Sequence, residues 1–143
     1  MSKTAFSINA AVLSAALVDQ ASEAAMKQRL VEAATALCSQ AKANCGKDKH
    51  QLEPSIHVVA PGQTDSSWPV VDKDGNSYDN ATHVTAGENE ALVVASTHRK
   101  SDGKDYSWYH EQDGLGPSFY MRRAANSVRG EFPDLDISEA RPI

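Results

Sequence analysis

Cysteine, aromatic residues and long apolar runs are all scarce in this sequence. Cys38 and Cys45 are the only cysteines, and on a helix they would lie about 10 Å apart along the axis, too far for a disulfide. No pair of histidines accompanies them, so they do not complete the four-ligand set of a zinc site. No apolar run approaches the roughly 18 residues of a membrane span, and the first residues do not resemble a secretion signal. We therefore expect free thiols, no metal, no membrane segment and synthesis in the cytosol.

Positive charge is in the minority as well. The 143 residues include 14 Lys and Arg against 19 Asp and Glu, which gives a formal net charge of −5. General nucleic-acid binders hold phosphates with an excess of positive charge, so the composition argues against that class. The length suits one domain with one modest core, which argues against an enzyme with a separate cofactor-binding domain.

Glycine and proline are absent from the first 45 residues, which contain thirteen alanines. This composition predicts a long helix over residues 10–43, with Ser7 or Asn9 as its N-terminal cap and Asn44 with Gly46 at its end. Apolar residues recur there at steps of three and four, and they are Leu13, Leu17, Ala21, Ala24, Leu30, Val31, Ala34, Leu37, Cys38 and Ala41. Such a stripe packs on the chain's own sheet or, in part, on another subunit.

After Gly46 the pattern changes to the alternation of β-branched and polar residues that is typical of strands. The predicted elements are strands at 55–60, 67–71, 82–86, 91–98 and 106–109, a turn at 72–76, and a helix at 118–129 that Gly130 stops. The fold class is therefore α+β: a long N-terminal helix packed on a four- to five-stranded antiparallel sheet, a short second helix and an extended C-terminal arm. We expect residues 1–130 to form one domain and residues 131–143 the arm.

Motifs of known catalytic or cofactor sites are not found in the sequence. It has no phosphate-binding loop, no dinucleotide fingerprint and no serine nucleophile elbow. The segment from Asp72 to Asn76 begins like a calcium loop, but the glycine and glutamate of such a loop are missing at the later positions, so a polar turn is predicted. The five histidines lack the spacing of metal ligands, and we expect them to be ordinary strand or loop residues. The prediction is a protein with no enzymatic activity, cofactor or metal.

One stretch of the sequence, residues 106–124, has a distinctive pattern. An aromatic strand ends in a glutamate, a glycine-rich loop follows, and a proline and an aromatic residue open a helix that soon contains an alanine. These positions are Tyr109, Glu111, Gly114, Gly116, Pro117, Phe119 and Ala124. The pattern resembles the neck and tail-completion proteins of siphophages, which include head–tail connectors and tail terminators. Gln112-Asp113 stands where that group has a Gly-Thr pair, and outside this stretch only the order of elements is similar.

The resemblance implies a structural virion protein, made in the cytoplasm of a host bacterium. It would form a homo-oligomeric ring at the phage neck or the head-proximal end of the tail, with six-fold symmetry favoured and twelve-fold symmetry as the alternative. Its partners would be other neck and tail-tube proteins, with DNA passing through the channel without specific binding. An acidic protein is compatible with that role, because it does not hold phosphates. The alternative is a small cytosolic ligand- or protein-binding module, and a small hydrolase comes third.

Charge is divided between neighbouring segments near the C-terminus. Residues 118–130 contain Arg122, Arg123, Arg129 and no acidic residue, whereas residues 131–143 contain one arginine and four acidic residues. Two explanations fit this division equally well. The basic helix of one subunit meets an acidic strand or arm of its neighbour, or the ion pairs form within one chain.

The predicted arm contains three apolar residues, Phe132, Leu135 and Ile137, separated by acidic residues and prolines. We expect little burial of this segment against its own domain, and instead docking on a neighbouring subunit by strand addition or in a groove. A disordered tail is the alternative. With the three arginines, these apolar residues form the predicted subunit interface.

Overall fold

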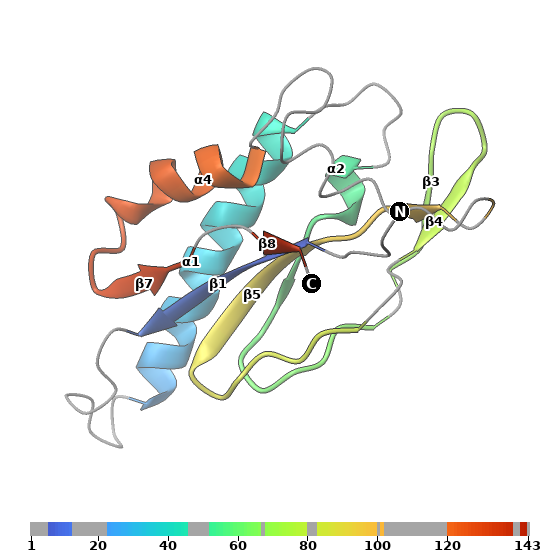
Figure 1. Cartoon of the computed structure of the whole chain (residues 1–143). Helices are drawn as coiled ribbons and strands as arrows, with labels where there is room; N and C mark the ends of the chain where they lie inside the picture. Colours follow the sequence, from blue (N-terminus) through green and yellow to red (C-terminus); the bar gives the residue numbers. More distant parts are fainter. Residues whose placement is uncertain are drawn as a thin grey trace.

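The computed structural model describes residues 6–12, 23–45, 52–66, 68–79, 83–99, 101, 120–138 and 141–142. The elements in chain order are β1 (Phe6–Val12), α1 (Glu23–Asn44), α2 (Leu52–Ser55), β2 (His57–Val59), β3 (Val70–Val71), β4 (Ser77–Asp79), β5 (Glu90–Ala95), β6 (His98–Arg99), α4 (Tyr120–Arg129), β7 (Leu135–Ile137) and β8 (Arg141–Pro142). The chain thus combines a long helix with short antiparallel strands (Figure 1), and the mixed helix-and-sheet class is confirmed.

Strand β1 lies at the centre of a five-stranded sheet. It pairs with β5 on one side and with β7 and β8 on the other, while β2 pairs with the far side of β5. Since every pair is antiparallel, β1 and β2 run in the same direction with β5 between them, and α1 connects them. In the same way α4 connects β5 to β7 across β1. Two such split β-α-β units make the ferredoxin-like arrangement of strands.

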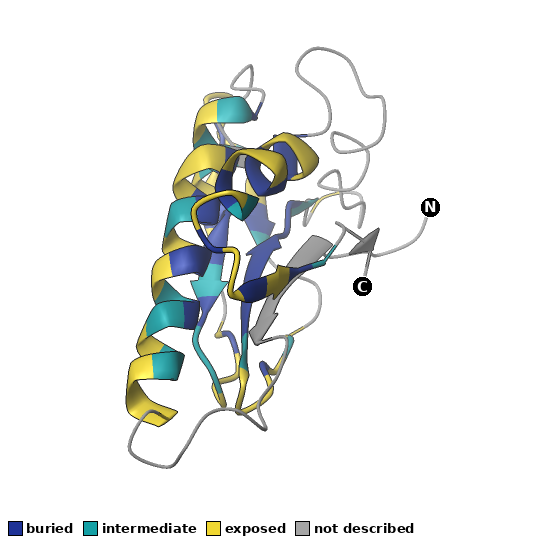
Figure 2. Ribbon diagram, turned by 90° about the vertical axis from the view of Figure 1, so that its left-hand side faces the viewer, coloured by how far each residue is buried: buried dark blue, intermediate teal, exposed yellow. Residues whose placement is uncertain are grey.

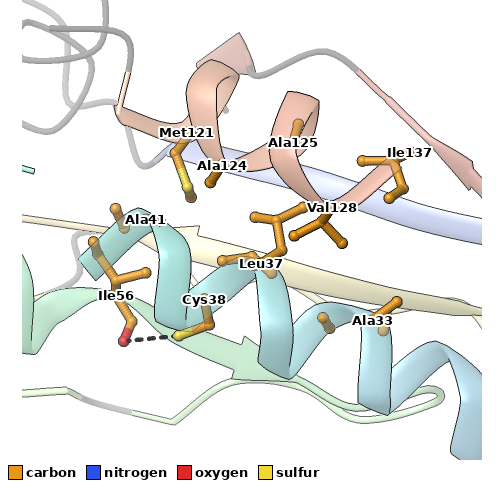
Figure 3. Packing of buried hydrophobic residues seen from close by; sticks show 14 of the residues in the cluster. Ala33, Leu37, Cys38, Ala41, Ile56, Met121, Ala124, Ala125, Val128 and Ile137 are labelled. Carbon is orange, nitrogen blue, oxygen red and sulfur yellow. Dashed lines mark hydrogen bonds between the residues drawn. The ribbon is translucent and has the colours of Figure 1, made fainter. Parts of the chain in front are cut away.

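Helices α1 and α4 cover one face of this sheet (Figures 1 and 2). Strand β5 contributes alternate residues to the two faces, as a strand must. Ala91, Val93 and Ala95 join the cluster under the helices, whereas Leu92 and Val94 join a smaller cluster on the other face. In the main cluster, Leu37 of α1 lies beside Val128 of α4, and alanines of both helices face the contact, which lets the helices pack closely (Figure 3).

The long helix begins at Glu23, not at Ala10 as predicted. Residues 6–12 form strand β1 instead, so the predicted caps Ser7 and Asn9 lie within a strand. The physical reason is that β1 pairs on both sides, and the gain from this central position outweighs the helix propensity of alanine. The end of the helix at Asn44 was predicted correctly.

Most of the predicted apolar stripe that the structure describes is buried. Its buried members are Leu30, Ala34, Leu37, Cys38 and Ala41. Ala24 is exposed and Val31 is half-buried. Leu13, Leu17 and Ala21 lie outside the described residues.

The C-terminal segment packs against its own domain, and this corrects our prediction of an extended arm with little burial there. Phe132, Leu135 and Ile137 are 8%, 7% and 5% exposed and belong to the chain's own main cluster. Strands β7 and β8 pair with β1, so the segment supplies one edge of the sheet. Without it, the backbone of β1 would lack hydrogen-bond partners on that side. The apolar spacing that we attributed to docking on a neighbour is the inward-facing alternation of this edge.

Most of the other strand predictions are confirmed in part. Strands β2 and β3 lie inside the ranges 55–60 and 67–71, β5 covers most of 91–98, and the turn at 72–76 is present. The range 82–86 contributes only an isolated bridge between Thr64 and Thr85. Helix α4 follows the prediction to its end at Arg129. The predicted strand at 106–109 and the first residues of the predicted helix lie outside the described residues.

Candidate functional site

A small second sheet projects beside the main one. Its strand order is β3-β4-β6, and β3 and β4 form a hairpin. In the turn of this hairpin, Asp72 accepts hydrogen bonds through Oδ1 from the backbone N–H groups of Asp74 and Asn76, both at 2.9 Å. Its Oδ2 accepts a bond of 2.8 Å from the Tyr78 hydroxyl, and Gly75 supplies the positive φ of 84° that the turn needs. The segment is a polar turn, as predicted, built around one carboxylate.

The hydrogen bonds to Asp72 keep it ionised. Burial raises the pKa of this carboxyl group, but the bonds from Tyr78, Asn76 and Asp74 outweigh that effect and lower the pKa to about 2. The negative charge is therefore part of the turn at every physiological pH.

His57 and Asp65 join the segment before the hairpin to the edge of the main sheet. His57 Nδ1 lies 2.8 Å from the backbone oxygen of Ser55, and its Nε2 lies 3.3 Å from Oδ2 of Asp65. Both partners are acceptors, so each ring nitrogen has an oxygen to which it can donate when it carries a hydrogen. The two side chains are 3% and 2% exposed. They form a buried polar contact between β2 and the loop that follows it.

Asp65 is held in place by the segment at residues 83–84. Its Oδ1 accepts a 2.6 Å hydrogen bond from the backbone N–H of Val84, and Nδ1 of His83 lies 2.9 Å from its backbone oxygen. Both oxygens of the carboxylate are thus bonded, one to a strand residue and one to the neighbouring loop. A buried polar group is stable only when it has such partners.

Trp68 completes this cluster. Its ring stacks on that of His57, with centroids 4.5 Å apart and planes 12° from parallel. Its Nε1 donates to the backbone oxygen of Pro54 at 2.7 Å, and its backbone N–H donates to Asp79 at 2.8 Å. Trp68 therefore fixes the hairpin to both α2 and β2 while 39% of its surface remains exposed.

A pocket of about 250 Å³ lies between β2 and the loop of residues 63–66, with Trp68 in its wall. His57 and Asp65 also line it, and the other lining groups are mostly small or polar. Within the described part of the chain, no three His, Cys, Asp or Glu side chains are placed to hold a metal ion. The pocket can receive a small neutral group by hydrogen bonding and by contact with the indole.

The outer face of α4 is polar and basic. Arg122 and Arg123 are exposed on it, whereas the inner face is buried. Arg123 donates to the backbone oxygen of Asn44 at 2.9 Å and so caps the C-terminal end of α1. Arg129 donates to the Asn126 side chain at 2.6 Å and to the backbone oxygen of Ile137 at 3.1 Å. Two of the predicted interface arginines thus have uncharged oxygen partners within the chain.

The structure brings only some of the predicted site residues together. Phe132, Leu135 and Ile137 lie in the core, and the arginines lie on α4. The motif residues Glu111, Gly114, Gly116, Pro117 and Phe119 lie outside the described residues. Contact of the arginines with another subunit stays a prediction.

Sequence reasoning missed the cluster of His57, Asp65 and Trp68. These residues are spread over a strand, a loop and the start of a hairpin, and no repeat or motif links them. Their contact arises when the loop after β2 folds back along the sheet, with the Thr64–Thr85 bridge fixing its position. Trp68 lies within the predicted strand at 67–71, but nothing in the sequence links it to His57 or Asp65.

Comparison of the chain with models of known families, with curated proteins and with solved structures gives no match. The resemblance to phage neck proteins therefore rests only on the sequence pattern of residues 106–124 and the order of elements, and it stays a prediction. None of the helices among the described residues combines the length and the apolar character needed to cross a membrane.

Proposed function

We propose that the chain is a structural subunit of a ring at the neck of a siphophage or at the head-proximal end of its tail. The observation that carries the proposal is the sequence pattern of residues 106–124, in which an aromatic segment, two glycines and a proline come before α4. Helix α4 begins at Tyr120, where that pattern requires a helix. Ala124, the alanine of the pattern, is fully buried, as expected of a position where two helices pack closely.

The surface of α4 also supports a role in assembly. Exposed arginines are frequent in protein interfaces, because their planar groups bind carboxylates and aromatic rings. On α4 the charges are of one sign, so a neighbouring subunit that presents acidic residues would be attracted. No enzymatic step is needed for this role.

The test is the fate of particles that lack the protein. We expect infection by the parent phage with its gene deleted to give DNA-filled heads and separate tails in negative-stain micrographs. Expression of the wild-type chain from a plasmid should restore joined particles, and a tagged chain should be found in purified virions. Normal yields of infectious phage without the protein would contradict the proposal.

A second candidate function, binding of a small ligand, is favoured by the pocket beside Trp68. The measurement is NMR mapping of a fragment library on the isotope-labelled chain. Fragments that bind there should shift the indole N–H of Trp68 and the amide of Gln63, and the Trp68→Ala variant should lose the shift at Gln63. A pocket that no fragment reaches would leave the assembly role as the better proposal.

A further inference from the structure

We propose that copies of this chain associate head to tail, with the β3–β4 hairpin of one copy contacting the outer face of α4 in the next. The inference rests on the proposed function, since it names the two faces that a ring would join. It names one particular contact, in which Arg122 belongs to the motif of residues 106–124 and the hairpin does not. It can therefore fail while the ring itself stands.

The hairpin presents an apolar contact surface. Trp68 and Val71 are 39% and 64% exposed, and they are the two exposed large apolar side chains among the described residues. The indole is already fixed by its stacking on His57 and by its bond to Pro54. A fixed aromatic side chain loses little conformational freedom on binding, which is why tryptophan is frequent at the centres of interfaces.

The outer face of α4 complements this surface in charge. On the hairpin Asp74 and Lys73 are exposed, Asp79 is half-buried and Asp72 is buried in the turn, whereas α4 contains three arginines and no acidic residue. Asp74 on the hairpin and Arg122 on the helix are both exposed. An arginine is also attracted to the face of a tryptophan, and its aliphatic stem covers apolar groups such as Val71. The two surfaces therefore match in both polar and apolar character.

The position of the two surfaces makes the contact intermolecular. In Figure 1, α4 lies at the left of the molecule and the hairpin at the right, with α1 and α2 between them, so the two surfaces do not meet within one chain. A contact between two different faces of identical molecules leaves one unused face at each end of every pair. Further copies then add until a ring closes or a filament grows.

Cross-linking of new thiols tests this geometry. In the full chain with Val71→Cys and Arg122→Cys, mild oxidation should give a ladder of dimers, trimers and larger species on a non-reducing gel. The matched control carries Val71→Cys with Glu32→Cys, which places the second thiol at an exposed position of α1. Each single variant has one new thiol and should stop at dimers. Equal ladders from the double variant and the control would overturn the proposal.

A charge exchange provides the second test. Arg122→Glu and Asp74→Lys should each abolish self-association in sedimentation velocity at high protein concentration, and an equimolar mixture of the two should restore it. In the mixture, each altered face meets its complement. Assemblies that persist in both single variants would overturn this contact and leave the ring proposal standing. A wild-type chain that does not associate, together with a double-cysteine variant that gives no ladder, would overturn the contact as well, while the particle experiment still decides the proposed function.

Discussion

Arg29 and Asp134, which are 105 residues apart in the chain, form a two-pronged ion pair between α1 and the turn before β7. Nε donates to Oδ2 at 3.1 Å, and Nη2 donates to Oδ1 at 3.0 Å. The same guanidinium lies 4.4 Å from the centre of the Phe132 ring. A parallel pair of charged hydrogen bonds fixes direction as well as distance. This contact fastens the C-terminal segment to the long helix.

Replacement of Arg29 should be detectable at Asp134. The hydrogen bond from Arg29 lowers the pKa of this carboxyl group against the opposing effect of its burial. In Arg29→Gln we expect the pKa to rise toward its ordinary value, as measured by NMR titration of the carboxyl carbon. Arg29→Lys keeps the charge but not the two-pronged geometry. In this variant the pKa of Asp134 should lie between the values in the wild type and in the glutamine variant. An unchanged pKa in the glutamine variant would show that the pair does not form in solution.

Leu37 is a test of the helix contact. It is 1% exposed and packs in the cluster between α1 and α4. We expect Leu37→Ala to lower the free energy of unfolding by about 2–5 kcal/mol, because it removes buried surface and leaves a cavity. Urea denaturation measures this, with Glu32→Ala on the exposed side of the same helix as a control near zero. Equal midpoints for both variants would contradict the packing of α1.

Asp72 should make stability depend on pH in acid. Its folded pKa of about 2 lies below the value of roughly 3.9 in an unfolded chain. A lowered folded pKa stabilises the protein above the unfolded value, and this contribution is lost as the pH falls toward 2. Thermal melts of wild type and Asp72→Asn should therefore differ at pH 6 and converge at about pH 2. Tyr78→Phe, which removes one hydrogen bond, should raise the pKa of Asp72.

Strand β7, at the edge of the main sheet, should contribute to the stability of the fold, whereas a free arm would not. Ile137 is buried and Asp136 beside it is exposed. Ile137→Ala should cost about 2–5 kcal/mol of stability, while Asp136→Asn should be nearly neutral. Truncation after Gly130 should lower the thermal midpoint sharply, because it removes three buried apolar side chains and both strands, β7 and β8, that pair with β1 on that side. A truncated chain with the thermal midpoint of the wild type would contradict this and would support the earlier prediction of an arm with little burial against its own domain.

Cys38 should be unreactive in the folded protein. Burial raises the pKa of its thiol, and Sγ lies 3.6 Å from the backbone oxygen of Ile56. Thiolates are the reactive form, so a buried thiol of raised pKa reacts slowly. Ellman's reagent should label Cys38 rapidly in urea and slowly without it, with an exposed thiol in Glu32→Cys as the fast reference. Fast labelling of Cys38 without urea would mean that α1 opens away from α2.

The predictions that held depend on neighbouring residues, and those that failed depend on distant ones. The turn at Asp72 and the end of α1 at Asn44 follow from local chemistry that any chain shows. The last residues of β1, from Ala10 on, were taken for the start of the helix because alanine favours helices, and only pairing with β5 and β7 makes them a strand. In the same way, nothing near Ile137 in the sequence reveals that its partner is Ala10. The contact of His57 with Trp68 likewise requires the finished sheet.

The central position of β1 has a consequence for synthesis. This strand leaves the ribosome before every other described element, yet its two neighbours, β5 and β7, come from the middle and the far end of the sequence. Strand β1 therefore has no partner in this sheet until β5 has emerged, and its second side stays unpaired until residues 135–142 have emerged. Folds that wait for such distant contacts form slowly and expose their edges to other chains meanwhile. The topology therefore predicts that one side of β1 stays open to pairing with other chains for almost the whole of translation.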